Sequence, residues 1–165
     1  MIQSKFCMND ILKECVQSQP TCPECGATWK EGISCESNFH QMLFWENEDP
    51  HLGVVHHLMV LAYHLQHPSR YSPEGLEYGI HLLVDFVERG VSPQQVRQKN
   101  RSAVDSHHRK WTIRARPGSR ASYPHPASWS MTTQDVVDAG AGHYVENVQA
   151  WARSIIANLR SAGNL

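Results

Sequence analysis

Hydrophobic residues recur at three- and four-residue steps along most of the chain, which predicts helices joined by short polar turns. The longest apolar stretch is residues 49–68, DPHLGVVHHLMVLAYHLQHP. Asp-Pro is a typical helix start and proline a typical stop, so we expect one helix from Asp49 to His67. Because apolar side chains occupy nearly all of its circumference, this helix should lie in the middle of the fold.

Other segments repeat the helical spacing with weaker apolar faces. Helices are expected over residues 8–17, 38–47, 72–90, 92–100, 132–139 and 143–159. Ser72-Pro73 is a typical start, Gly90 a typical end, and Thr132 with Asp135 fits a capping box. Residues 101–130 are rich in proline and glycine, which predicts a long irregular loop with a short strand at 111–114. The sequence therefore predicts a mainly α protein, a small helical bundle around a central His-bearing helix.

Length and composition fit a single domain spanning residues 1–165, because 165 residues of which 41% are hydrophobic can bury a core without disulfides. Its expected parts are an N-terminal helix and cysteine knuckle, a helical core, a basic loop and C-terminal helices, at residues 1–36, 37–100, 101–130 and 131–165. No apolar run approaches the roughly 20 residues of a membrane span. The first residues also lack a secretory apolar stretch, so we expect a cytoplasmic protein.

Five cysteines and 11 histidines add chemistry to this picture. Cys22, Cys25, Cys35 and His40 follow the spacing Cys-x2-Cys-x9-Cys-x4-His, which is typical of a zinc site. His56 could replace His40 as the fourth ligand. An ion held by four protein ligands would be structural, because a catalytic zinc keeps one position open. Buried thiols without a metal are the alternative, and a thioredoxin-like role is disfavoured because no βαβ pattern surrounds the motif.

The central helix carries a stripe of imidazoles. Projected at about 100° per residue, one side holds four histidines: His56, His57, His64 and His67. If the next helix runs back antiparallel, Glu77, His81 and Asp85 come near His64 and His67. This predicts a second metal or catalytic site, with His67 and His81 binding metal or moving protons in a hydrolase or lyase. The alternative is that the acids and His81 form a solvated helix flank.

Positive charge is concentrated in residues 97–120. The only acid there is Asp105, against eight bases: Arg97, Lys99, Arg101, Arg109, Lys110, Arg114, Arg116 and Arg120. Such a segment could bind nucleic acid through phosphate contacts. Because it contains no recognisable docking element, a solvated loop is the favoured interpretation.

Several motifs together resemble a known family. They are CPECGA, FHQMLFWE, VHHLMVLAYHLQHP, VERGVSP and WSMTTQDV before YVENVQAWA. They are similar to a bacterial family of uncharacterised small proteins that share an N-terminal CxxCG, a further cysteine, a VHxLxxxAYxxQHP helix and a C-terminal WxMTxxDV segment. The resemblance extends over roughly residues 22–152. It implies that the following residues occupy family-motif positions: Cys22, Cys25, Cys35, His56, Tyr63, Gln66, His67 and His81.

These observations favour a zinc-binding helical protein over a metal-dependent enzyme or a nucleic-acid-binding module. Cys22, Cys25 and Cys35 are the expected zinc ligands, completed by His40 or His56. The protein would act on an unidentified small molecule or protein through a His-lined pocket or partner surface. The residues expected to line it are His56, Tyr63, Gln66, His67 and His81.

Overall fold

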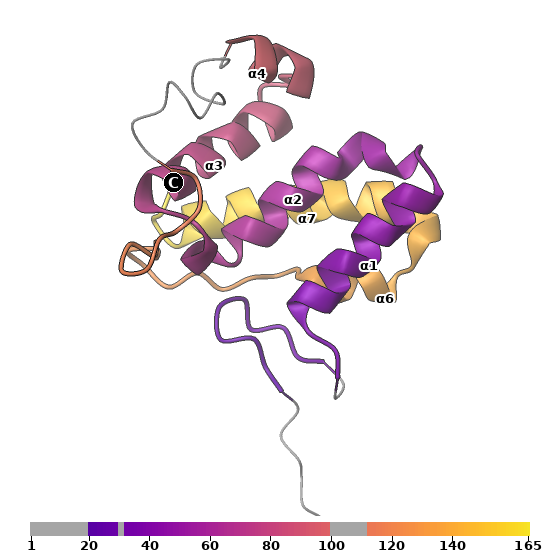
Figure 1. The fold of residues 1–165 in the computed structure, drawn as a ribbon, viewed down its shortest axis with the longest axis horizontal. Helices are drawn as coiled ribbons and strands as arrows, with labels where there is room; N and C mark the ends of the chain where they lie inside the picture. Colours follow the sequence, from indigo (N-terminus) through magenta and orange to yellow (C-terminus); the bar gives the residue numbers. More distant parts are fainter. Residues whose placement is uncertain (1–19, 30–31, 100–111) are drawn as a thin grey trace, which may run out of the picture.

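The computed structural model describes residues 20–29, 32–99 and 112–165, and the predicted helix over residues 8–17 lies outside them. The described part is mainly α, as predicted (Figure 1). Its helices are α1 Cys35–Glu48, α2 His56–Leu65, α3 Pro73–Val87, α4 Pro93–Lys99, α6 Thr133–Asp138 and α7 Tyr144–Ser161. Short 3-10 turns lie at η1 Leu52–Val55, η2 Pro68–Arg70 and η3 Ala141–His143. Residues 101–111 of the predicted loop also lie outside the described residues. Of the strand predicted at 111–114, the described residues 112–114 contain only an isolated bridge, between Arg114 and Tyr71.

The α2 helix occupies the centre of the bundle, as its apolar circumference predicted. It packs against α7 and α3, while α1 packs against α6 (Figure 1). Met59, Ala62 and Leu65 of α2 have no exposed surface, and neither has Trp151 of α7. Burying one large apolar side chain contributes about 1.5–3 kcal/mol. This shared interior therefore holds the bundle together.

The single long helix predicted from Asp49 to His67 is wrong. The backbone N–H of Asp49 bonds the Trp45 carbonyl and ends α1, and its carboxylate accepts a hydrogen bond from the His51 N–H at 3.0 Å. The chain then makes the η1 turn before α2 begins. At the other end His67 leaves the helix, with φ −126° and ψ 64°, because the proline after it disfavours the helical region.

The helix caps predicted from the sequence are present at the predicted residues. The Ser72 hydroxyl accepts a hydrogen bond from the Gly75 N–H at 3.0 Å and begins α3, and Gly90 follows that helix with φ 63°. Thr132 and Asp135 form the capping box of α6. Residues 112–130 form no helix, and this segment runs beside α2 and α3 to the start of α6 (Figure 1).

Candidate metal centre

The Cys-Pro-Glu-Cys-Gly segment forms a tight knuckle that carries two thiols. The Cys22 N–H donates to the Ala27 carbonyl at 2.8 Å, and the Gly26 N–H donates to the Cys22 carbonyl at 2.9 Å. Gly26 has φ 72°, a conformation that glycine adopts without the strain of a Cβ. The turn therefore fixes Cys22 and Cys25 in one short loop.

Cys35 and His67 come to this knuckle from two other segments. Cys35 is the first residue of α1, and His67 lies between α2 and η2. One donor atom from each of Cys22, Cys25, Cys35 and His67 lies within 4.8 Å of all the others. All four residues are buried, none more than 7% exposed. The structure thus assembles a Cys3His group that could bind a metal ion.

The distances in the group fit a tetrahedral ion. With Zn–S near 2.3 Å and Zn–N near 2.0–2.1 Å, ligand sulfurs would be about 3.8 Å apart, and a sulfur and a nitrogen about 3.6 Å apart. The Cys25 and Cys35 sulfurs are 3.4 Å apart, and the Cys22 sulfur is 3.5 Å from Nε2 of His67. Small shifts of these side chains would therefore admit the ion.

The imidazole of His67 is oriented by the helix that precedes it. Nδ1 lies 2.6 Å from the Tyr63 carbonyl, which can only accept, so Nδ1 carries the hydrogen and donates it. Nε2 is thereby directed at the cysteine sulfurs. Metal-binding histidines use this arrangement, in which the second nitrogen donates to a carbonyl or carboxylate.

The pKa values of Cys22, Cys25 and His67 are shifted in different directions. Hydrogen bonds with Cys25 and Cys35 hold the pKa of Cys22 well below its usual value, and hydrogen bonds with Cys22 and Cys35, helped by burial, raise the pKa of Cys25. For His67, burial favours the neutral form, but hydrogen bonds with the two thiols Cys22 and Cys35 and with the Tyr63 carbonyl outweigh it and raise the pKa to about 10. An incoming cation would displace these protons, as metal binding to cysteine and histidine does.

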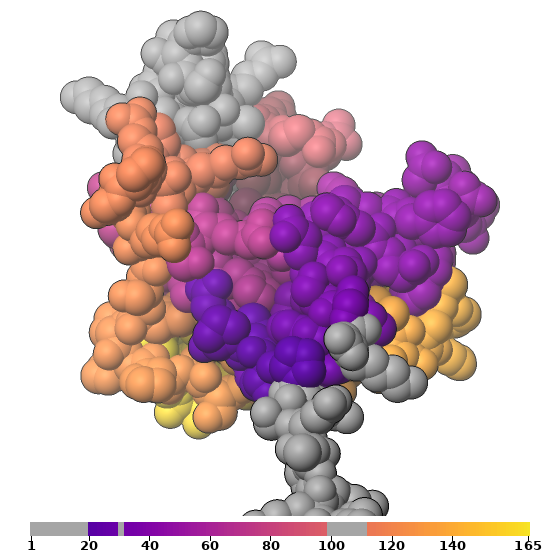
Figure 2. Space-filling view, turned by 60° about the horizontal axis from the view of Figure 1, so that its bottom comes forward, coloured from indigo at the N-terminus to yellow at the C-terminus, as the bar shows by residue number. Residues whose placement is uncertain are grey.

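Glu24, at the tip of the knuckle, ties the group to the rest of the fold. Its carboxylate accepts hydrogen bonds from the N–H and the hydroxyl of Ser69, both at 3.0 Å. Its backbone carbonyl accepts from the indole N–H of Trp129 at 3.3 Å. Figure 2 shows the indigo knuckle between the orange segment after residue 112 and the purple α1. Sequence reasoning missed Glu24, because its partners lie 45 and 105 residues away.

Neither histidine expected as the fourth ligand lies in the group. His40 is exposed on α1, one and a half turns beyond Cys35, where its ring faces Phe39. His56 is exposed at the start of α2, and its Nδ1 lies 2.5 Å from Glu46. The structure places His67 there instead. The signal that could have found it is the proline after it, which turns this residue out of the helical stripe.

The second site expected on α2 and α3 is not assembled. The His81 side chain is 68% exposed, and its nearest acid is Glu77 of the same helix at 4.0 Å. Asp85 pairs with Arg89 at 2.5 Å, and His67 is buried in the Cys3His group. The expected His-lined surface is also divided: Tyr63, Gln66 and His67 are buried, whereas the side chains of His56 and His81 are exposed.

Fold and site together define a small helical protein whose Cys3His group joins an N-terminal knuckle to the end of its central helix. Sequence comparison places it further: the chain belongs to a family of unknown function, DUF5946, whose model matches residues 20–160. That range includes the knuckle, the group and nearly all of α7. No curated protein and no solved structure is significantly similar to the chain. Within the described residues, every helix is too short or too polar to cross a membrane.

Proposed function

We propose that this protein is a zinc-binding helical protein in which the ion is structural and the activity is the binding of a small molecule or a protein. The observation that carries the proposal is the convergence of four buried donors from three separate segments, within 4.8 Å of one another. Three thiols and one imidazole are a donor set that structural zinc sites use. Free thiols such as those of Cys22, Cys25 and Cys35 are typical of a reducing compartment, and we propose the cytoplasm.

A structural role follows from closure of the coordination shell. Four protein donors leave no open position for water or a substrate. The donors are also shielded from solvent, and they connect the knuckle, the start of α1 and the end of α2. Because ion and fold form the site together, zinc binding would contribute directly to folding stability.

The test is the metal content of protein purified without added metal or a histidine tag. We expect one zinc per chain in the wild type and in His40→Ala, which removes an exposed imidazole outside the group. Cys25→Ser should retain less than half of the zinc. Elemental analysis gives the metal, and a chromogenic chelator added to denatured wild type gives its stoichiometry even if Cys25→Ser does not fold.

Other outcomes contradict the proposal. Iron in place of zinc would identify the group as an iron site and not as a structural zinc site. Full zinc content in Cys25→Ser, or a loss in His40→Ala as large as in Cys25→Ser, would place the ion elsewhere.

A further inference from the structure

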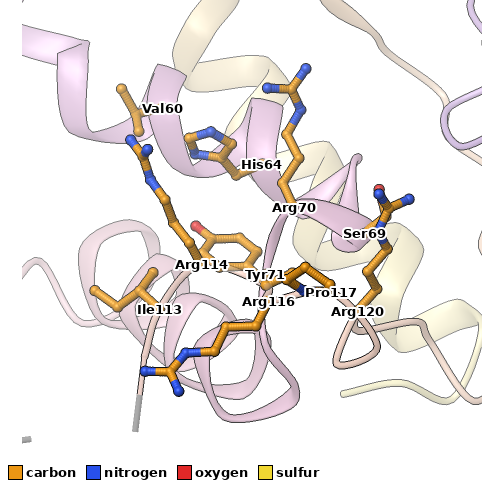
Figure 3. Close-up of a pocket in the computed structure, with 11 residues that line it drawn as sticks. Val60, His64, Ser69, Arg70, Tyr71, Ile113, Arg114, Arg116, Pro117 and Arg120 are labelled. Carbon is orange, nitrogen blue, oxygen red and sulfur yellow. The ribbon is translucent and has the colours of Figure 1, made fainter.

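A basic hollow of about 710 Å³ lies beside α2, outside the Cys3His group. Its walls are the second half of α2, the η2 turn and residues 113–120 (Figure 3). No aspartate or glutamate is among the described residues that line it, whereas four arginines are: Arg70, Arg114, Arg116 and Arg120. None of the four metal-site side chains takes part in the lining.

Most of this positive charge is not neutralised within the described structure. Arg70 lies 3.6 Å from the exposed carboxylate of Glu36, and its guanidinium is 5.1 Å from the ring centre of Tyr63. In the described ranges, no carboxylate comes within 4.0 Å of the other three arginines. These guanidinium groups therefore have hydrogen-bond donors available for an anion.

His64 lies between two of these arginines. In Figure 3, Arg70 and Arg114 extend on either side of its ring, while Arg116 extends away from it. Burial, followed by the charges of Arg70, His67 and Arg114, lowers the pKa of His64 to about 4. The hollow thus combines a neutral imidazole with charged guanidinium groups.

The segment that carries Arg114 is held rigidly against α3. The Ser72 N–H donates to the Ile113 carbonyl at 2.9 Å, and the Ala115 N–H donates to the Arg70 carbonyl at 3.0 Å. The backbones are so close that a Cβ at Gly75 would lie 2.3 Å from the Ile113 carbonyl oxygen. The backbones that carry Arg70 and Arg114 are therefore positioned in advance, which lowers the entropy that a ligand must overcome.

We propose that this hollow binds a small organic phosphate, with the arginines on the phosphate and the apolar wall of Val60, Tyr71 and Ile113 against the organic part. The planar guanidinium fork matches phosphate oxygens in pairs. The volume lies within the roughly 300–1,000 Å³ of small-molecule sites. A concave site of this kind differs from the protruding helix or ribbon that reads duplex grooves.

The test is a calorimetric titration with phenyl phosphate, and with benzoate as a carboxylate of similar shape. Phenyl phosphate should bind saturably, and benzoate more weakly. Arg114→Gln should weaken phenyl phosphate binding about tenfold, the usual loss for a charged hydrogen bond. The matched control is Arg153→Gln, which makes the same charge change at an exposed position of α7 outside the hollow. Arg116→Gln serves as a second variant if Arg114→Gln does not fold.

Each of the following results would overturn the inference. The first is equal loss of affinity in Arg114→Gln and Arg153→Gln, which would reflect net charge alone. The second is benzoate binding as tight as phenyl phosphate binding, or no saturable phenyl phosphate binding at low salt. The third is tighter binding of a single-stranded oligonucleotide with a steep salt dependence, which would assign the arginines to nucleic acid. Zinc content is measured separately, so failure here leaves the structural-zinc proposal intact.

Discussion

The Cys3His group and the basic hollow both include residues at the end of α2, yet their polar atoms are arranged in opposite ways. In the group, the donors of Cys22, Cys25, Cys35 and His67 face one another and are shielded from solvent. In the hollow, four arginines line an open space, and apart from Arg70 they have no carboxylate partner among the described residues. Four metal-ligating side chains that face one another need only an ion to complete the site. Guanidinium groups without a carboxylate partner, placed around a space, have hydrogen-bond donors available for a ligand that comes from outside.

The largest expected effect separates the two regions by stability. Cys22→Ser or Cys25→Ser should lower the free energy of unfolding by several kcal/mol, because the ion and the fold form together. Arg114→Gln should change it by less than about 0.5 kcal/mol, as surface substitutions usually do. Urea unfolding followed by circular dichroism measures both. An unchanged free energy of unfolding in Cys22→Ser would contradict the structural role of the group.

The next effect tests whether the hollow is held rigidly by α3. Gly75→Ala places a methyl group against the Ile113 carbonyl oxygen, so it should cost about 1–3 kcal/mol, as overpacking does. It should also weaken phenyl phosphate binding, because the Arg114 segment must move. The measurements are urea unfolding and calorimetric titration.

Gly79→Ala is the matched control on the same helix. There the new methyl group meets two side chains at ordinary contact distances, Leu65 at 3.4 Å and the Tyr71 hydroxyl at 3.5 Å, and alanine favours a helix over glycine by roughly 0.5–1 kcal/mol. We therefore expect stability close to wild type or slightly higher. Equal stability and equal binding in the two variants would show that the close approach at Gly75 is unimportant.

These two regions also show how far the sequence alone leads. Periodicity predicted the central α2 helix, and local capping signals predicted Ser72, Gly90 and the Thr132–Asp135 box, because all of these depend on neighbours within four residues. The cysteine spacing singled out the three thiols that come together, since a CxxCG turn fixes two of them within one loop.

The features that the sequence does not predict depend on contacts between residues that are far apart along the chain. The helical projection places His67 on a stripe of one helix, whereas the proline after it turns its ring toward the knuckle. The basic hollow joins Arg70 to residues 113–120 through the Tyr71–Arg114 bridge, a pairing that no local pattern encodes. The sequence shows the eight bases between residues 97 and 120, but it does not show which other segment they lie against.

A smaller effect is expected at the connection between the two regions. Glu24 accepts two hydrogen bonds from Ser69, and Ser69 also lines the hollow. Glu24→Ala should cost about 1–2 kcal/mol, because it leaves the Ser69 donors without their carboxylate. It should also speed the transfer of zinc to a chelator, since the knuckle is less firmly held.

The control is Glu77→Ala, which removes a carboxylate whose only described partner is the exposed His81 at 4.0 Å. Exposed pairs of this kind contribute about 0–1 kcal/mol. If zinc transfer is equally fast in Glu24→Ala and Glu77→Ala, the connection through Ser69 does not hold the knuckle.

The smallest effect on stability is expected at Arg160, whose guanidinium already has a carboxylate partner within the protein. Arg160 forms two hydrogen bonds with Glu88, at 2.5 and 2.7 Å, and these lower the pKa of the Glu88 carboxyl. A carboxyl whose folded-state pKa is lowered stabilises the protein above its ordinary pKa, and this contribution is lost as the pH falls through the lowered value. Glu88→Gln should therefore be slightly less stable than wild type near neutral pH, and the difference should disappear in acid.

Arg160→Gln should leave phenyl phosphate binding unchanged, because this guanidinium is satisfied within the protein. If Arg160→Gln weakened binding as much as Arg114→Gln, the unpaired arginines of the hollow would have no special role, and the contrast between the two regions would reduce to net charge.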